Sequence, residues 1–319
     1  IVDFYYHMKS PSDNAKLYVI QKKKDSTQST IDILCDNDAG NAWQHCTLYV
    51  ESDIEQIGFG GSISPGHVYP DIAIDNISIR PLTHNENPDI INSDIVWDKE
   101  SFGTNKIIES DIIIENGAKL TITKGNVSNN NNITLKMLPD AKIIVKPGGK
   151  LILDGCTLDC ACDNEMWQGI QVWGNNTKDQ LLHDGSYYQG FVEIKNKSRI
   201  KNALCAVELW NPDNWSSTGG IIHARNSTFE NNAKAIHAIN YNNTLPNGNI
   251  LNYNAIFTNC EFTINGNYKG VATFYKHVDL ANVTGVRFHG CDFSIKTDDD
   301  NSGDDGPIRI DNVSYWSEG

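Results

Sequence analysis

Two groups of side chains in this sequence have types that could support acid–base chemistry. Glu208 and His237 fall at matching positions of two similar segments, so a fold that stacks these segments would place a carboxylate beside an imidazole. Four carboxylates between Asp154 and Glu165 form the second group, but they cluster along the chain instead of recurring at a fixed interval. The sequence shows neither a nucleophile elbow nor a phosphate-cradling glycine loop, and we interpret Glu208 and His237 as a surface pair rather than a catalytic couple.

Two acidic segments could hold a cation. Asp298, Asp300 and Ser302 place oxygen ligands at alternate positions before a glycine, which is how a calcium loop begins. The closing bidentate glutamate is missing, so a hydrated acidic turn is the alternative, and bound calcium would stiffen a connection rather than perform chemistry. Asp71 and Asp75 are the second candidate for calcium, with a carboxylate that bonds the backbone at a strand irregularity as the alternative.

The chain has eight cysteines, and three of them are closely spaced. Cys156, Cys160 and Cys162 resemble half of a zinc site, but a second pair of ligands at zinc spacing is missing. We therefore expect these cysteines to be buried in stacked strands. Cys35 and Cys46 flank a predicted hairpin and could pair across it in an oxidising compartment.

Two tryptophans supply the clearest binding signal. Trp210 and Trp215 flank the turn Asn211-Pro-Asp-Asn, which we expect to project from the fold. An exposed indole is a flat platform on which a sugar ring can stack, so both residues are candidate ligand-binding residues for a glycan. Packing of this loop back onto the fold is the alternative.

The elements that would position these side chains follow from an internal repeat. The segment 111–122 aligns with the segment 142–153 at a spacing of 31 residues, and apolar residues alternate within both segments. Alternation is typical of β-strands, and the glycine-containing turn between the two strands of each segment indicates a corner. A repeat of this length with strand periodicity predicts stacked coils of a β-solenoid.

A second series of positions extends this register along the chain. A large apolar residue recurs one turn of the repeat apart and predicts a continuous internal ladder: Val127, Leu158, Ile200, Phe229, Phe262 and Phe293. Small residues two positions earlier form a neighbouring inward column: Cys156, Ser198, Ser227, Cys260 and Cys291. Asn202 over Asn231 predicts an asparagine ladder at a corner. The phrase at 167–174 predicts one more strand, with Gly169 and Gly174 as corners.

Composition excludes some functional classes. The net charge of −14 argues against nucleic-acid binding, because phosphate contacts require an excess of Lys and Arg. Apolar stretches are all shorter than the ~20 residues that a membrane-spanning helix needs, so we expect no membrane insertion. Both ends of the chain read like the interior of a larger protein, and we expect a fragment truncated at both ends.

Residues 1–80 lack the repeat and resemble the later part of a MAM domain, a jelly-roll β-sandwich of adhesive ectodomains. The resemblance depends on the strands near Phe4 and Val19, on Trp43 before an alternating strand, and on the closing phrase 71–79. In that phrase Ile77 and Ile79 have the opposite parity to Ile72 and Ile74. We expect a bulge near Asn76 that returns them to the core.

The region 95–319 resembles the right-handed parallel β-helices of large secreted proteins from the Bacteroidota, which often use type IX secretion. The residues that carry the resemblance are the phrase Trp167–Gly174, the segment 190–194 and the stretch 198–203. Together the two resemblances imply an all-β chain. It would consist of a partial jelly-roll sandwich at 1–80, a linker at 81–94 that ends just before Trp97, and a right-handed parallel β-helix at 95–319.

The functional expectation is a non-catalytic binding or adhesion module at the bacterial cell surface. Its partners would be a surface glycan or a protein ligand, together with the secretion and attachment machinery of the outer membrane. A polysaccharide lyase or glycoside hydrolase is the enzymatic alternative, because parallel β-helices include such enzymes, and a purely structural stalk is the third. We expect no cofactor other than calcium.

Overall fold

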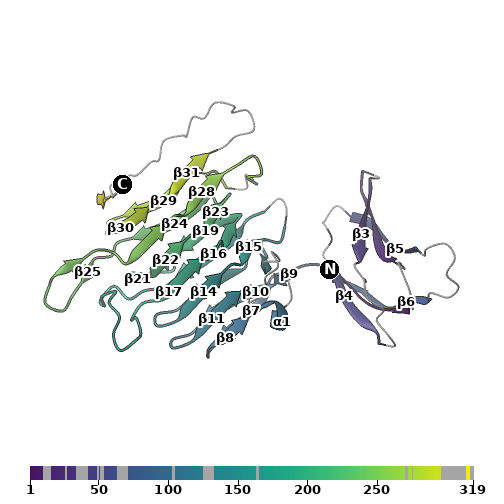
Figure 1. Ribbon diagram of the computed structural model, residues 1–319, viewed down its shortest axis with the longest axis horizontal. Helices are drawn as coiled ribbons and strands as arrows, with labels where there is room; N and C mark the ends of the chain where they lie inside the picture. Colours follow the sequence, from purple (N-terminus) through teal and green to yellow (C-terminus); the bar gives the residue numbers. More distant parts are fainter. Residues whose placement is uncertain are drawn as a thin grey trace. The chain divides into compact units, whose positions relative to one another are not determined.

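A computed structural model describes residues 1–9, 16–25, 27–33, 42–48, 50, 54–62, 71–102, 105–124, 133–162, 165–269, 272–274, 276–295 and 314–316. The chain divides into two compact units, Ile1–Leu82 and Thr83–Gly319. Both are built from β-strands (Figure 1), and the single helix within the described ranges is the short α1, Lys99–Phe102. The all-β expectation is therefore confirmed.

The first unit contains two three-stranded antiparallel sheets that share one core. Their strand orders are β4-β1-β6 and β3-β2-β5. The strands are β1 (Val2–Lys9), β2 (Lys16–Lys23), β3 (Gln28–Ile33), β4 (Gln44–Leu48), β5 (Ile54–Ser62) and β6 (Asp71–Ile79). Alternate residues of β1 and β2 point inward, and Phe4 from one sheet meets Phe59 from the other with ring centroids 4.9 Å apart.

The expected irregularity in β6 is present, but its expected effect is wrong. The register against β1 shifts between Asp3 and Tyr5, and Asn76 has a φ of 54°, so the strand carries a bulge at Asn76. Ile77 and Ile79 nevertheless remain 51% and 68% exposed, so the bulge does not return them to the core.

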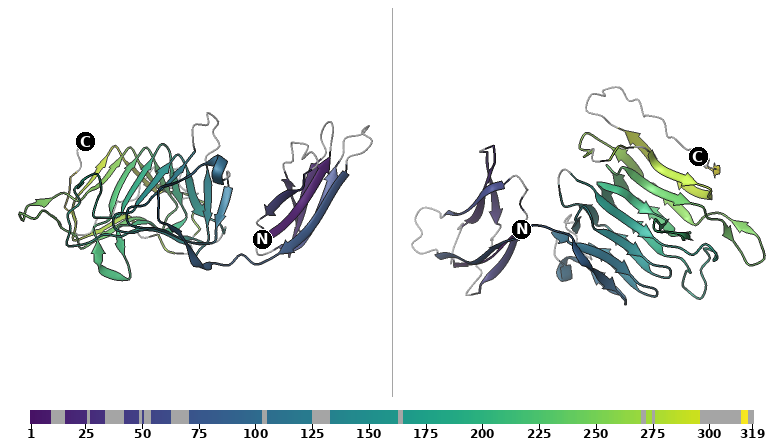
Figure 2. Two further views of the ribbon diagram at one scale, coloured as in Figure 1. Left: turned by 90° about the horizontal axis from the view of Figure 1, so that it is seen from below. Right: turned by 180° about the vertical axis from the view of Figure 1, so that it is seen from behind.

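The second unit is a parallel β-solenoid in which each coil contributes one strand to each of three sheets (Figure 2). Sheet I consists of β7 (Asn85–Ile91), β10 (Ser110–Ile114), β13 (Lys142–Val145), β16 (Trp167–Val172), β19 (Ala203–Glu208), β24 (Lys234–Ile239) and β29 (Lys276–Ala281). Sheet II consists of β8 (Ile95–Trp97), β11 (Lys119–Thr123), β14 (Lys150–Asp154), β17 (Phe191–Lys195), β22 (Ile221–Arg225), β27 (Ala255–Thr258), β30 (Thr284–His289) and β32 (Ser314–Trp316). Sheet III consists of β9 (Asn105–Ile108), β12 (Thr134–Met137), β15 (Thr157–Cys160), β18 (Arg199–Lys201), β23 (Thr228–Glu230), β28 (Glu261–Ile264) and β31 (Asp292–Ile295).

The solenoid starts earlier than the sequence indicated. Strand β7 pairs with β10 in parallel, and β8 places Trp97 beside Ile122. Strand β7 therefore lies inside the segment 81–94 that we expected to be a linker. Its burial pattern explains the difference, because most of its residues are exposed and only Ile91 is buried, so it lacks the apolar alternation of the later strands.

The predicted registers are confirmed for the main ladders. Leu120 lies beside Leu151, and Phe262 lies beside Phe293 with the two rings stacked 4.6 Å apart. Phe229 stacks on Phe262 at 4.8 Å, so three consecutive coils share one column of parallel rings. One position differs: Leu135 pairs with Leu158, where the repeat predicted Val127, a residue outside the described ranges.

Asparagines form several corners of the solenoid by adopting left-handed backbone angles. Asn226 and Asn259 do so between sheets II and III, with φ values of 46° and 50°, and the Asn259 amide donates to Asn226 Oδ1 at 3.4 Å. Asn is one of the few residues that tolerate this conformation because its amide can bond nearby groups. Asn202 and Asn231 occupy the next corner in the same conformation. Their amides bond other partners: Asn202 donates to Asp159 at 2.6 Å, and Asn231 donates to Asn265 at 2.8 Å.

Candidate functional site

A row of polar side chains crosses the outer face of sheet I. In-register pairing places Gln171 beside Glu208, Glu208 beside His237, and His237 beside Asp279. Their neighbours Val207 and Ile236 are fully buried, because successive side chains of a strand point to opposite faces. We call Glu208, His237 and Asp279 the polar row.

The polar row holds an imidazole between two carboxylates. His237 Nδ1 lies 2.8 Å from Glu208 Oε1, and His237 Nε2 lies 3.8 Å from Asp279 Oδ2. The Trp210 indole nitrogen is also 3.4 Å from His237 Nδ1, but an indole N–H can only donate and a carboxylate can only accept. The shorter contact decides the proton: Nδ1–H donates to Glu208, which leaves Nε2 as the ring nitrogen that faces away from that carboxylate.

Two lysines fix the charge of Asp279. Lys276 Nζ lies 2.8 Å from Asp279 Oδ1, and Lys234 Nζ lies 2.9 Å from Asp279 Oδ2. Burial opposes ionisation of Asp279, but the hydrogen bonds from Lys276 and Lys234 outweigh it and lower the pKa of the carboxyl. Asp279 is therefore an anion at neutral pH, and it completes a mixed row of hydrogen-bond donors and acceptors.

The tryptophans of the predicted turn lie beside the polar row. They belong to a hairpin of β20 (Trp210–Asn211) and β21 (Asn214–Thr218), whose projection from the solenoid is visible in the left view of Figure 2. Trp210 is 7% exposed and packs edge-on against His237, with ring centroids 5.8 Å apart. Trp215 is 66% exposed, and its ring lies 5.2 Å from that of Trp210. Both alternatives weighed for this loop therefore apply, one to each indole.

A loop pocket adjoins the hairpin. Its first wall is the segment 174–190, which is tied to β21 by bonds from Asn176 N to Ser216 O (3.2 Å) and from Ser217 Oγ to Gly174 O (3.0 Å). The cavity has a volume of about 660 Å³, and its polar and aromatic lining includes Asp179, His183, Tyr188, Asn240, Asn242 and Thr244.

The pocket holds a second carboxylate–imidazole pair, which the sequence analysis missed. His183 Nε2 lies 2.8 Å from Asp179 Oδ1, and the His183 ring packs 4.7 Å from the Tyr188 ring. Burial raises the pKa of Asp179, but the hydrogen bonds from His183 and from the Leu181 backbone outweigh it and leave the pKa lowered. The separation of four residues between Asp179 and His183, in a segment longer than the repeat allows, was the signal available.

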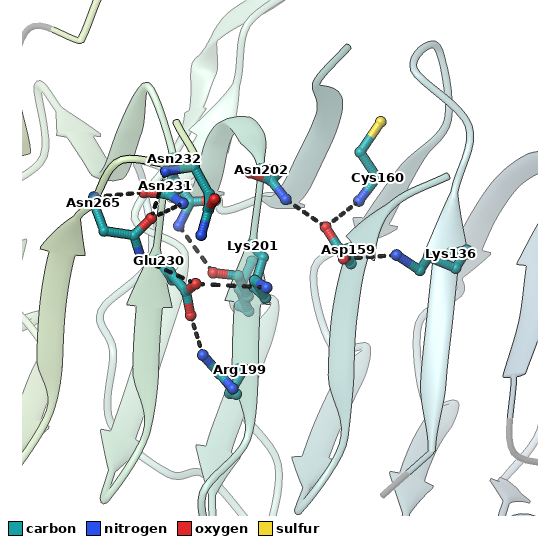
Figure 3. A network of polar contacts seen from close by, with 12 residues as sticks. Lys136, Asp159, Cys160, Arg199, Lys201, Asn202, Glu230, Asn231, Asn232 and Asn265 are labelled. Carbon is teal, nitrogen blue, oxygen red and sulfur yellow. Dashed lines mark hydrogen bonds and ion pairs between the residues drawn. The ribbon is translucent and has the colours of Figure 1, made fainter. Parts of the chain in front are cut away.

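The outer face of sheet III carries a different polar network (Figure 3). Glu230 is 6% exposed and pairs with both Arg199 and Lys201, while Lys136 Nζ lies 2.8 Å from Asp159 Oδ2. Burial opposes ionisation of Asp159, but the bonds from Lys136 and Asn202 lower its pKa. These carboxylates have cationic partners on neighbouring coils, which indicates that they join the coils.

The predicted cation ligands are not brought together. Asp75 is exposed and its Oδ1 accepts from Asn76 N at 2.7 Å, so this carboxylate bonds the backbone at the bulge. The side chain of Asp71 lies outside the described residues, and so do Asp298, Asp300 and Ser302. No cluster of three His, Cys, Asp or Glu side chains that could hold a metal occurs in the part of the chain that the structure describes.

The cysteines near the start of sheet III occupy its interior. Cys156 and Cys160 are buried at 0% and 1% exposure, as expected for stacked strands. Burial raises the pKa of the Cys156 thiol to about 12 and that of Cys160 to about 11, which disfavours the thiolate that zinc would require. Cys35, the expected partner of Cys46, lies outside the described residues.

Comparisons with protein-family models, with curated proteins and with solved structures find no match for this chain. Within the described ranges, no helix combines the length and the apolar character that a membrane span requires.

Proposed function

We propose that the hairpin β20–β21 and the adjoining polar row form a glycan-binding surface. The observation that carries this proposal is Trp215, an indole 66% exposed at the side of a row of hydrogen-bonding groups. Sugars combine an apolar ring face with many hydroxyl groups, so they match a flat aromatic platform beside fixed carboxylates and imidazoles. Trp210 supports the platform from below, because it is buried between Trp215 and His237.

A glycan array screened with the full chain, followed by calorimetric titration of the strongest glycan, tests this proposal. Trp215→Ala should weaken binding about tenfold, since an aromatic stacking contact contributes ~0.5–1.5 kcal/mol beyond its buried area. Trp43→Ala is the matched control, because Trp43 is 48% exposed in the first unit and should not affect binding. Absence of any bound glycan, or an equal loss in both variants, would contradict the proposal and favour a structural stalk.

Acid–base catalysis on a polysaccharide is the second candidate, because Glu208 orients the His237 ring and leaves Nε2 available. A lyase or glycoside hydrolase would release unsaturated ends or reducing sugars from acidic polysaccharides. That release should be lost in Glu208→Gln. Products from the unmodified chain that disappear in this variant would replace binding alone with catalysis as the function of the row.

The setting that we propose is a secreted protein at a bacterial surface. The long internal repeat and the antiparallel first unit support it, through their resemblance to right-handed β-helix and MAM-like jelly-roll modules of the Bacteroidota. Its partners would be a surface glycan or protein ligand and the type IX secretion and attachment machinery of the outer membrane. Fractionation of the source cells tests this setting, and a cytoplasmic pool alone would contradict it.

A further inference from the structure

Two cysteines lie one above the other at the last described coils of sheet III. Glu261 pairs with Asp292, and Asp292 N donates to Cys260 O at 2.9 Å, so Cys260 and Cys291 occupy equivalent positions on consecutive coils. Equivalent residues of adjacent strands are about 4.8 Å apart. This separation lies within the Cα–Cα range of roughly 4.4–6.8 Å that a disulfide spans.

The two thiols have the same orientation and contact each other. Cys260 Sγ donates to Thr258 O at 3.5 Å, and Cys291 Sγ donates to the matching carbonyl of His289 at 3.6 Å. A hydrogen bond also joins the two side chains, and it raises the pKa of Cys260 while it lowers that of Cys291. Cys291 is half-buried and Cys260 is 1% exposed, so the more accessible thiol is also the one that ionises more readily.

The remainder of this inward column shows that the pairing is specific to this position. Cys156 lies two coils earlier than Ser227, and its neighbour on the next coil is Ser198, whose Oγ accepts from Cys156 N at 3.3 Å. Ser227 follows before Cys260. Cys260 and Cys291 are therefore the consecutive thiols among the described members of this column.

We propose that Cys260 and Cys291 are the site of a coil-to-coil disulfide that forms in an oxidising compartment with a small disulfide such as oxidised glutathione. The Cys291 thiolate attacks one sulfur of glutathione disulfide, which gives a mixed disulfide and expels one glutathione thiolate. Cys260 then loses its proton to solvent and attacks the Cys291 sulfur, which expels the second glutathione thiolate. Two protein thiols are oxidised, and one glutathione disulfide is reduced to two thiols.

The position of the bond gives it a structural role. Strand β31 is the outermost strand of sheet III and has β28 as its one neighbour in that sheet. An outermost strand keeps one side without ladder partners and opens more readily than an inner strand. A disulfide from Cys260 to Cys291 would attach β31 covalently to the coil beneath it.

Peptide mapping of the full chain tests the proposal directly. The reduced protein is incubated with oxidised glutathione, its remaining thiols are alkylated, and it is digested without reductant. We expect an intact mass lower by two hydrogen atoms and a cross-linked peptide that joins Cys260 to Cys291. Alkylation of both cysteines after oxidation, a persistent glutathione adduct on Cys291, or a cross-link to another cysteine in its place would overturn the proposal.

Variants add a readout of the structural role. Oxidation should raise the thermal unfolding midpoint of the solenoid in the unmodified chain and in Cys156→Ser, the matched control from the same column. It should not raise the midpoint in Cys260→Ser or Cys291→Ser. Because mapping of the unmodified chain needs no variant, the proposal stays testable if either substitution impairs folding.

Discussion

At the scale of single residues, Asp279 is the side chain whose charge is most firmly set by its surroundings. It accepts from Lys276 and Lys234, which lie at equivalent positions of β29 and β24, so one carboxylate joins two coils. The two ammonium groups lower its pKa against the opposing effect of burial. Asp279 therefore stabilises the solenoid as well as completing the polar row.

We predict that Asp279→Asn lowers the free energy of unfolding by about 1.5–3 kcal/mol at pH 7, the range for hydrogen bonds to charged groups. The pKa of Asp279 is lower in the folded chain, so its contribution is present above the ordinary carboxyl pKa of about 4 and disappears as the pH falls through the folded value. The difference from the unmodified chain should therefore shrink below about pH 4. Denaturant titrations across pH measure it, with Asp292→Asn, an exposed carboxylate of sheet III, as control. A difference that persists unchanged in acid would contradict the assignment.

The sequence predicted part of the polar row and missed the rest for a geometric reason. Glu208 and His237 are 29 residues apart, close to the repeat, and their pairing could be predicted from aligned segments. Asp279 follows His237 by 42 residues, because the hairpin of β25 (Asn243–Thr244) and β26 (Ile250–Leu251) enlarges that coil. An insertion of this kind hides the register from a fixed-period search, and it also concealed the replacement of Val127 by Leu135.

At the scale of elements, a bulge sets the phase of the polar row. Gly169 pairs with Cys205 but the next residue, Ile170, pairs with Val207, so Ala206 is an extra residue in β19. This shift turns Glu208 outward beside Gln171. The expectation that Gly169 forms a corner is wrong: it lies within β16, with a φ of 101°.

Gly169→Ala should destabilise the solenoid strongly. A Cβ at this position would collide with the Cys205 carbonyl, and the backbone conformation is one that residues with side chains rarely adopt. We expect a loss of about 3 kcal/mol or more, from strain and from the displaced strand. Gly117→Ala is the matched control: its φ is also positive, at 79°, but a Cβ there meets no atom within 4 Å. It should cost only about 1 kcal/mol. Equal losses in denaturant titrations of the two variants would show that the collision does not matter.

Bulges of this kind cannot be predicted from the repeat alone. The period of 31 residues fixed which coils stack, and the apolar alternation fixed the inward positions for most strands. A single inserted residue changes the parity of everything that follows it in the strand, and the sequence near Ala206 carries no turn or breaker signal that marks it. The same limitation applies to Ile77 and Ile79, where the bulge was predicted but its consequence for burial was not.

At the scale of the whole molecule, the chain consists of two units with separate cores. The first core centres on Phe4, and the second is the column of rings through Phe262. The described residues of Phe4's cluster all belong to the first unit. Units that do not share a core can unfold independently, so a single two-state transition is not expected for this chain.

We therefore predict two thermal transitions in calorimetry, each sensitive to one substitution. Phe262→Ala removes a fully buried ring from the middle of the stack and should destabilise the solenoid transition by about 3–5 kcal/mol, leaving the other in place. Phe4→Ala removes an equally buried ring that contacts Phe59, and it should lower only the transition of the first unit. Each variant is the control for the other. If either substitution shifted both transitions together, the two cores would form one cooperative structure, and glycan binding at Trp215 would then depend on the first unit as well.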